Sequence, residues 1–282
     1  NITLQTDATT LTLTGQTEGF IITTANGTNT VTGSAGVDTI TGGNNADTIK
    51  VAATTEGNSD VMTGGTGDDT LELTGISHTF ANDDNLATIE NITLQTDATT
   101  LTLTGQTEDF TITTADGNNT VITGSGNDTI TGGAGNDAII NTAGNSALTG
   151  GAGVDTFTVT DGAVTISDLG AGDSADVVDL NDGTVAATAT GAWTATSVTD
   201  NAGADNTEFT IAVESAGAVD LSSASTTGAG YTVTSTGTSA VTGSDDADAL
   251  TNTSGATTYI GGAGIDTFTV TDGAVTISDL GA

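Results

Sequence analysis

Residues 132–159 read GGAGNDAIINTAGNSALTGGAGVDTFTV, and a glycine recurs there at every ninth position. The same spacing extends on both sides of the stretch, through Gly117, Gly126, Gly135, Gly144, Gly153 and Gly162. An apolar side chain follows four residues after each glycine, in the order Val121, Ile130, Ile139, Leu148, Phe157 and Ile166. Nine is neither a helical period nor the period of a simple hairpin. The pattern therefore predicts a repeating unit of one turn and one short strand.

Each nine-residue unit divides into these two parts. In Thr129-Ile130-Thr131, an apolar residue lies between two threonines, which predicts a three-residue strand with its middle side chain pointing inward. The other six residues, of which 132–137 are typical, form a turn in which glycine supplies positive φ and lets backbone carbonyls converge. Repetition predicts an all-β fold, a parallel β-roll or β-solenoid with two nonapeptides in each coil and a thin apolar core.

Longer repeats indicate that whole modules are duplicated. Residues 1–18 recur unchanged at 91–108, and residues 150–171 recur at 261–282 with only Val154 replaced by Ile265. We expect tandem modules at 1–90, at 91–180 with a closing segment, and at 228–282, joined by a β-rich connector at 181–227. Two alternating runs, around Trp193 and from Glu208 to Glu214, predict a short β-hairpin insertion in this connector, with Trp193 in packing.

The charge balance excludes several classes of partner. The chain has 36 acidic residues, one lysine, no arginine and no cysteine. It cannot neutralise phosphates, which excludes nucleic acid, and an anionic membrane surface would repel it. Disulfides and zinc–thiolate sites are absent, and no apolar run approaches the roughly 18 residues of a membrane span. The acids must face water or be neutralised from outside, for which a divalent cation is the simplest candidate.

Four segments, 64–72, 132–140, 150–158 and 261–269, match the pattern G-G-x-G-x-D-x-U-x. The chain therefore resembles the RTX (repeats-in-toxin), or hemolysin-type calcium-binding, repeat family. The segment from Ile166 to Leu180 is similar to the one that often closes such blocks. The resemblance implies a β-roll that binds Ca²⁺, with turn carbonyls completing each ion's shell, as in surface-layer proteins and large adhesins.

The spacing itself also suits calcium. In a coil of two nonapeptides, turns 18 residues apart lie on one edge, and coils stack about 4.8 Å apart. An oxygen–Ca²⁺–oxygen bridge spans about 4.6–5.2 Å, whereas a Mg²⁺ bridge spans only about 4.0–4.2 Å. Without the ion, stacked carboxylates repel each other. We therefore expect calcium binding and folding to be coupled.

This rule selects pairs of candidate ligands. Asp137 pairs with Asp155, and Asp248 with Asp266. If a four-residue slip loops out near 53–57, Asp38 pairs with Asp60 and Asp47 with Asp69. Asp128 faces Ser146 on the opposite edge, which should bind poorly. The glycines expected to supply close backbone are Gly132, Gly135, Gly150, Gly153, Gly261 and Gly264. The alternative, that these turns are merely soluble loops, stays open, as does a capping role for the acids Asp168, Asp173, Asp176 and Asp179.

The sequence offers few residues that could act in catalysis. His78 is the only histidine, expected on the surface, and neither HExxH nor a nucleophile elbow is present, so we expect no enzyme. The favoured function is a calcium-stabilised structural segment of a secreted bacterial cell-surface protein, extracellular and able to self-associate into a layer or filament. Two alternatives remain: recognition of ice or carbohydrate by outward threonines, and an export or folding module of a secreted enzyme.

Overall fold

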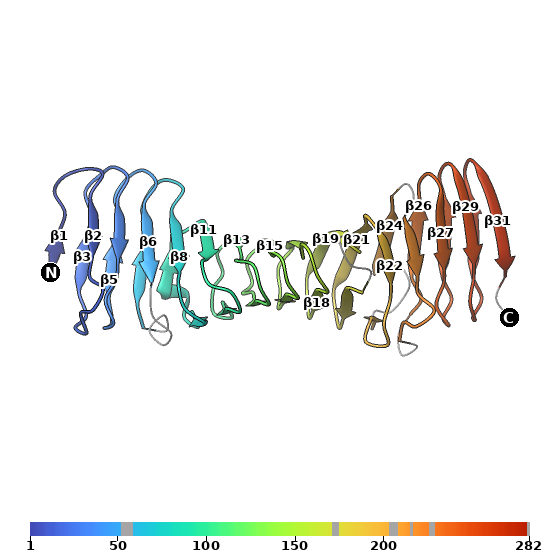
Figure 1. Ribbon diagram of the computed structural model, residues 1–282, viewed down its shortest axis with the longest axis horizontal. Helices are drawn as coiled ribbons and strands as arrows, with labels where there is room; N and C mark the ends of the chain where they lie inside the picture. Colours follow the sequence, from blue (N-terminus) through green and yellow to red (C-terminus); the bar gives the residue numbers. More distant parts are fainter. Residues whose placement is uncertain (52–58, 171–174, 203–207, 215–216, 226–228, 281–282) are drawn as a thin grey trace. The chain divides into compact units, whose positions relative to one another are not determined.

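Short parallel strands and tight turns alternate along the computed structural model, which describes residues 1–51, 59–170, 175–202, 208–214, 217–225 and 229–280. The chain divides into two compact units, unit 1 (Asn1–Gly133) and unit 2 (Ala134–Ala282). In each unit successive coils lie side by side (Figure 1), and the strands pair in parallel. The predicted all-β parallel solenoid is confirmed. Within the described ranges we find no helix with the length and apolarity of a membrane-spanning helix.

Unit 1 stacks its strands in columns. One sheet has the order β1 (Ile2–Thr3), β3 (Ile21–Thr23), β5 (Thr39–Thr41), β7 (Val61–Thr63) and β10 (Leu86–Ala87). A second contains β2 (Thr10–Thr12), β4 (Thr30–Thr32), β6 (Thr48–Val51), β8 (Thr70–Leu73), β11 (Asn91–Leu94), β13 (Thr111–Thr113) and β15 (Thr129–Thr131). A third sheet contains β9 (Ser77–Thr79), β12 (Thr100–Thr102) and β14 (Thr120–Ile122), and the 3₁₀ turn η1 (Asp83–Asn85) lies between β9 and β10 in the chain.

The coils of unit 1 vary in length. Ile22 pairs with Ile40, 18 residues later, as two nonapeptides require. Ile40, however, pairs with Met62, 22 residues later. The four extra residues agree with the predicted slip; the place where they were expected to loop out, 53–57, lies outside the described residues. Extra residues are accommodated because only the inward apolar side chain must stay in register.

Variable coil length has a consequence for the duplicated segments. Residues 2–3 belong to the sheet of β1, whereas their exact copies at 92–93 belong to β11, in the other sheet. The two copies have identical sequences and an offset of 90 residues, which would equal whole coils only if every coil had 18. Longer coils between them place the copies on opposite sides of the solenoid.

Unit 2 contains a similar set of columns. One has the order β17 (Ala147–Thr149), β19 (Ala163–Leu169), β21 (Thr184–Ala189), β24 (Phe209–Val213), β26 (Thr232–Ser235), β28 (Ala249–Asn252) and β30 (Thr267–Val270). Facing strands are β16 (Ala138–Asn141), β18 (Thr156–Val159), β20 (Val177–Leu180) and β23 (Asp200–Asn201). Later coils use β22 (Ala192–Thr194), β25 (Ala218–Asp220), β27 (Ser239–Thr242), β29 (Ala256–Ile260) and β31 (Ala274–Asp279).

The predicted β-hairpin insertion in 181–227 is wrong. β22, which carries Trp193, pairs in parallel with β25, and β24 pairs in parallel with β21 and β26. The connector is thus part of the solenoid, with coils longer than 18 residues. Alternating apolar residues specify a strand with one buried face but not its partner, so they could not distinguish a hairpin from a parallel coil. Trp193 is buried, as expected, and its indole Nε1–H donates to the carbonyl of Asp176.

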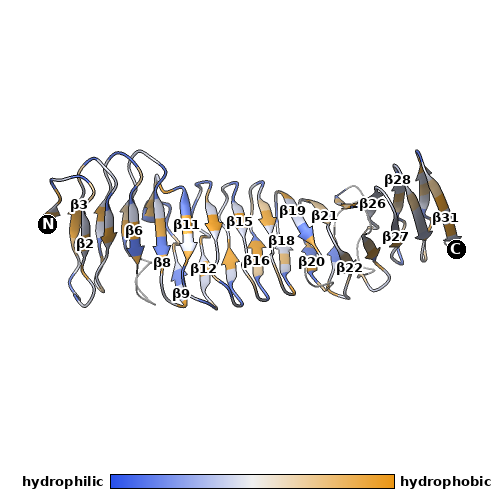
Figure 2. Cartoon of the chain, turned by 45° about the horizontal axis from the view of Figure 1, so that its top comes forward, coloured by the Kyte–Doolittle hydropathy of each residue, from blue (hydrophilic) through white to orange (hydrophobic). Residues whose placement is uncertain are grey.

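The core is the thin column of inward side chains that the nonapeptide predicts. In the three-residue strands of unit 1 from β3 onward the middle residue is buried, as for Val31, Ile40 and Ile112, whereas Leu11 in β2 is half-buried. Hydrophobic residues lie mainly on the strands, and the connecting turns are mostly hydrophilic (Figure 2). Because each coil contributes so few apolar side chains, burial alone stabilises the fold weakly.

His78 is not on the surface, as the sequence suggested, but in this core. It is the inward residue of β9 and pairs in register with Leu101. It is 1% exposed, and neither ring nitrogen has a hydrogen-bond partner. Burial lowers the pKa of its imidazole. The triplet Ser77-His78-Thr79 has the strand pattern with histidine in the apolar position, a substitution that an isolated sequence does not flag.

His78→Leu should therefore stabilise the protein, by about 1–2 kcal/mol, because it removes a desolvated polar ring from an apolar site. A lowered pKa means that the unfolded chain binds more protons below pH 6.5. The stability of the wild type should thus fall, relative to that of His78→Leu, as the pH drops below this value. Thermal melts in saturating Ca²⁺ across this range measure the difference, with His78→Ala, which leaves a cavity, as the destabilised control. Equal melting temperatures for wild type and His78→Leu would contradict the placement of His78.

Candidate calcium-binding turns

A ladder of carboxylates runs along the turns. In each case the backbone N–H of one aspartate donates to Oδ1 of the matching aspartate in the next coil. The nitrogen–oxygen distances are 2.8 Å for Asp38–Asp60, 2.6 Å for Asp47–Asp69, 2.8 Å for Asp137–Asp155 and 3.0 Å for Asp248–Asp266. The structure therefore brings together each of the four pairs that the repeat selects, including the two across the slip.

In some of these carboxylates the second oxygen, Oδ2, accepts a backbone N–H from the same turn. Oδ2 of Asp47 accepts the N–H of Gly43 at 2.9 Å, and Oδ2 of Asp248 accepts the N–H of Ser244 at 2.7 Å. Two members of the ladder lack this bond: Oδ2 of Asp69 and Oδ2 of Asp266 are buried without a hydrogen-bond partner. A buried, unpartnered carboxylate oxygen is costly unless a cation or a proton compensates it.

Glycine at the first turn position faces these oxygens. A Cβ on Gly42 would lie 1.9 Å from the carbonyl oxygen of Gly64, in the next coil, and 2.8 Å from Oδ2 of Asp47. In unit 2 a Cβ on Gly243 would lie 2.1 Å from the carbonyl oxygen of Gly261 and 2.5 Å from Oδ2 of Asp248. The absent side chain thus leaves a small cradle between a carboxylate of one turn and a carbonyl of the next.

The other predicted glycines take related places. A Cβ on Gly150 would lie 2.2 Å from Oδ2 of Asp155, and one on Gly261 would lie 2.4 Å from Oδ2 of Asp266. The glycines that stand two residues before the aspartate adopt positive φ, which only glycine does without strain; they are Gly135, Gly153 and Gly264. Gly132 is buried at the start of its turn.

Burial and mutual repulsion shift the carboxylate pKa values upward. For Asp155, burial raises the pKa to about 7; the N–H of Asp137 opposes the shift, and nearby carboxylates, Asp176 first, add to it. Burial likewise raises the pKa of Asp248 to about 6, against hydrogen bonds from Tyr231 and Ser244. The pKa values of Asp69 and Asp266 are also raised, again mainly by burial. The chain's one lysine, Lys50, pairs with Glu72 instead.

Asp128 belongs to the same kind of turn. Its Oδ1 accepts the N–H of Phe110 at 2.9 Å, and burial raises its pKa to about 6. The same arrangement recurs where Asp38 accepts the N–H of Phe20 and Asp248 that of Tyr231. Each of these three aspartates thus accepts the N–H of an aromatic residue in the preceding coil. Sequence reasoning missed this feature, although the signal is present: an aromatic residue stands in the aspartate position one coil earlier.

Three further acidic side chains accept hydrogen bonds from the turn backbone. Asp69 donates its N–H to a carboxylate oxygen of Glu90 at 2.8 Å, a residue that the sequence did not single out. In the closing segment, Asp176 accepts the N–H groups of Asp155 and Gly170. Asp168 accepts the N–H groups of Gly150 and Gly151, at 3.0 and 2.8 Å. The acids left open as caps therefore include two that bind turn backbone; Asp173 lies outside the described residues, and Asp179 is in register with Asp200 on β23.

The donor set fits Ca²⁺. Every candidate group is a carboxylate or a backbone carbonyl oxygen, the hard ligands that Ca²⁺ prefers, and the cradles and orphaned oxygens lie between successive turns. In the described part of the chain, no group of three or more acidic or histidine side chains is placed so that it could hold a metal ion. Two carboxylates and the turn carbonyls would therefore share each ion.

Comparison with known protein families supports the same assignment. The RTX calcium-binding nonapeptide repeat matches the chain in four copies, at residues 23–51, 54–73, 113–148 and 142–166. No curated protein and no solved structure matches the chain. The matches include the turns of Asp38, Asp47, Asp69, Asp128 and Asp137, and the turns of Asp248 and Asp266 repeat their geometry outside the matched ranges. The chain thus contains four copies of the RTX calcium-binding nonapeptide repeat, folded as a β-roll.

Proposed function

We propose that this chain is a structural segment of a secreted bacterial cell-surface protein, of the surface-layer or adhesin kind, which becomes rigid when it meets extracellular Ca²⁺. The observation that carries the proposal is the ladder of paired, buried aspartates in a chain whose single lysine binds Glu72. Such a ladder makes the fold dependent on a ligand that is scarce in the cytosol and abundant outside. Extracellular calcium modules work at about 10⁻⁴–10⁻³ M.

The remaining chemistry supports a structural role. The sole histidine is buried and unpartnered on β9, so it cannot serve as a general base exposed to substrate. Aspartates that ligate Ca²⁺ are likewise not free to transfer protons. We therefore assign the segment no enzymatic step. Lateral assembly into a layer or filament is part of the proposal.

The location can be tested in the bacterium that makes the protein. Immunogold electron microscopy with antibodies against the folded, calcium-loaded chain should label the outer surface of intact cells. A calcium chelator should release the labelled material or make it sensitive to added protease, and an antibody to a cytosolic protein serves as the control for lysis. Label confined to the cytosol, with intact cells unlabelled, would reject the proposed location. Labelled material without a layer or filament would reject only the assembly.

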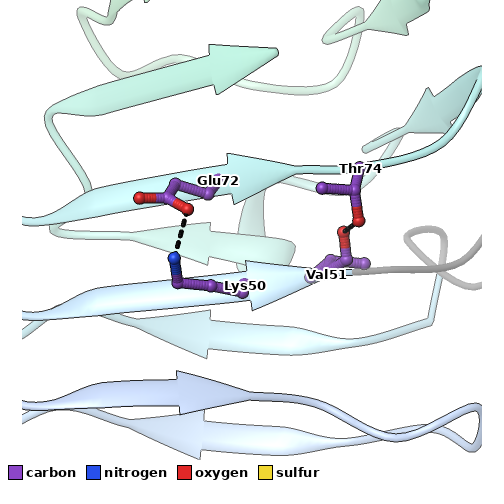
Figure 3. Close-up of polar contacts among 4 residues, drawn as sticks. All are labelled: Lys50, Val51, Glu72 and Thr74. Carbon is purple, nitrogen blue, oxygen red and sulfur yellow. Dashed lines mark hydrogen bonds and ion pairs between the residues drawn. The ribbon is translucent and has the colours of Figure 1, made fainter. Parts of the chain in front are cut away.

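Recognition of a regular lattice, such as ice or a carbohydrate, is a second candidate function. It is favoured by rows of threonine side chains on unit 1. On the sheet from β2 to β15, residues flanking the buried central side chains fall in register in two outward rows. The first row comprises Thr10, Thr30, Thr48, Thr70, Asn91, Thr111 and Thr129. In the second, threonines are interrupted by the Lys50–Glu72 ion pair (Figure 3). Within each row the residues repeat at the spacing of neighbouring strands, about 4.8 Å, so the face presents a regular array.

A thermal-hysteresis assay in saturating Ca²⁺ tests this second candidate for ice, and binding to insoluble polysaccharides tests it for carbohydrate. Thr111→Lys should abolish either activity without changing the circular dichroism spectrum. A matched exposed change away from the sheet, Thr28→Lys, should leave it intact. Absence of both activities in the folded wild type would eliminate lattice recognition and leave the structural proposal standing.

A further inference from the structure

Asn29 stands in the aspartate position of its turn, directly before β4, and its side chain does something that no aspartate can do. Its amide Nδ2 donates to the carbonyl oxygens of Ala25 at 2.9 Å and Gly27 at 2.6 Å, both in its own turn. The same nitrogen lies 3.1 Å from Oδ1 of Asp47, in the next coil. Three oxygens from two successive turns thus converge on one N–H₂ group.

Asn119, 90 residues after Asn29, repeats the arrangement. Its Nδ2 donates to the carbonyl oxygens of Ala115 at 2.7 Å and Gly117 at 2.9 Å. Its Oδ1 accepts the N–H of Thr99 at 3.0 Å, just as Oδ1 of Asn29 accepts the N–H of Thr9 at 3.1 Å. Both asparagines are buried. The two turns are therefore closed entirely by groups of the chain.

The aspartate turns have the opposite hydrogen-bond polarity at this point. In the turn of Asp47 the carboxylate accepts the N–H of Gly43, four residues earlier. In the turn of Asn29 the amide donates to the carbonyl of Ala25, also four residues earlier. An ionised carboxylate has no hydrogen to donate, so an aspartate can be linked to a turn carbonyl or to a second carboxylate only through a proton or a cation.

We infer that Asn29 and Asn119 are ion substitutes within the calcium ladder: each amide nitrogen, the counterpart of an aspartate's Oδ2, makes the link to turn carbonyls for which a carboxylate needs Ca²⁺. This inference rests on the proposed calcium-dependent fold and divides its turns into two kinds. The asparagine turns are closed by hydrogen bonds without metal, whereas the aspartate turns need Ca²⁺ to become ordered. Choice between Asn and Asp at this single position thus sets how many ions the solenoid binds and which coils are ordered before calcium arrives.

Asn29→Asp is accordingly expected to create a calcium site. The new carboxylate would face the carbonyls of Ala25 and Gly27 and the carboxylate of Asp47, an all-oxygen set that Ca²⁺ prefers. Equilibrium dialysis at saturating Ca²⁺ should show one more bound ion per chain than in the wild type. The matched control is Asn26→Asp, which adds the same charge at an exposed position of the same turn and should leave the ion count unchanged. An unchanged count in folded Asn29→Asp would overturn the inference.

The reverse exchange keeps the test decisive if Asn29→Asp does not fold. In Asp47→Asn the amide can donate to the turn carbonyls as Asn29 does. This variant should bind fewer ions than the wild type and reach half-maximal folding at a lower Ca²⁺ concentration. Half-maximal folding at an equal or higher Ca²⁺ concentration would contradict the substitution. If the wild type itself binds no Ca²⁺, the proposed function fails; if it binds Ca²⁺ and neither exchange changes the count, only this inference fails.

Discussion

Removing Ca²⁺ at a pH of about 7.5 is expected to abolish most of the β-structure, and lowering the pH to about 5 in the same chelator is expected to restore a large part of it. Both effects have one cause. The ladder aspartates are buried beside one another in a chain with a single lysine, so their charge opposes folding until an ion or a proton neutralises it.

The direction of the pH effect follows from the pKa shifts. In the folded chain the pKa of Asp155 is about 7 and those of Asp128 and Asp248 are about 6, each raised from 3.8. Between these values the folded state binds more protons than the unfolded state, so the metal-free protein gains stability as the pH falls. The gain is complete below the unfolded value of 3.8 and is lost as the pH rises through about 7.

His78 acts in the opposite direction, because its lowered pKa makes the folded state less stable in acid. It is a single group, whereas several aspartates favour acid folding, so the net effect of acid on the metal-free chain should be stabilising. With Ca²⁺ bound the aspartate contribution reverses, because protons then compete with the ion.

Circular dichroism from a pH of about 8 to about 4.5, with chelator or with Ca²⁺ in excess, measures both effects. At 100 times the dissociation constant each independent site adds about 2.7 kcal/mol, so several sites should convert a largely unfolded chain into a folded one. Mg²⁺ at the same concentration is the matched control and should fail, because it bridges too short a span. Full β-structure at neutral pH in chelator would contradict the account.

Gly42→Ala is expected to destabilise the calcium-loaded protein by roughly 3 kcal/mol or more, at the upper end for overpacking. The added Cβ would lie 1.9 Å from the carbonyl oxygen of Gly64, a backbone atom that cannot rotate away. It would also crowd Oδ2 of Asp47 at 2.8 Å. Either the coils separate or the carboxylate moves, and both changes spoil the ion's position.

Gly15→Ala provides the comparison for this effect. Gly15 has a φ of +85°, but a Cβ added there would meet nothing within 4 Å, so alanine costs only the left-handed strain, about 1–2 kcal/mol. Thermal melts and calcium titrations of both variants separate backbone strain from crowding of the site. Gly42→Ala should require more Ca²⁺ to fold and Gly15→Ala should shift the titration less. Equal shifts would show that Gly42 is an ordinary turn glycine.

The nine-residue period was sufficient to predict the strands, the turns and the aspartate pairs. Because the inward apolar residue and the turn glycines are both fixed by the period, the chain can stack in few other ways. The pairing of Asp38 with Asp60 followed once four extra residues were allowed in one coil, and the structure brings these residues together. Regions that obey the repeat are therefore predictable in detail.

Features that depart from the period were not predictable. The connector coils around Trp193 alternate like a hairpin, and only the parallel register with β25 reveals a solenoid. His78 occupies an apolar position despite its polarity. Asn29 and Asp47 stand at the same position of the repeat and differ only in one side-chain group, an amide NH₂ in place of a carboxylate oxygen. This exchange reverses the direction of a hydrogen bond. Each of these depends on contacts with a neighbouring coil, which the order of residues alone does not specify.

A crystal structure of the calcium-loaded protein, with anomalous scattering recorded at a wavelength where calcium contributes strongly, locates the ions themselves. We expect anomalous peaks between the turns of Asp47 and Asp69, of Asp137 and Asp155, and of Asp248 and Asp266, each within bonding distance of carboxylate and carbonyl oxygens. We expect none at the amide of Asn29. A folded solenoid without peaks between these turns, its carboxylates held only by backbone N–H groups, would contradict calcium-dependent folding.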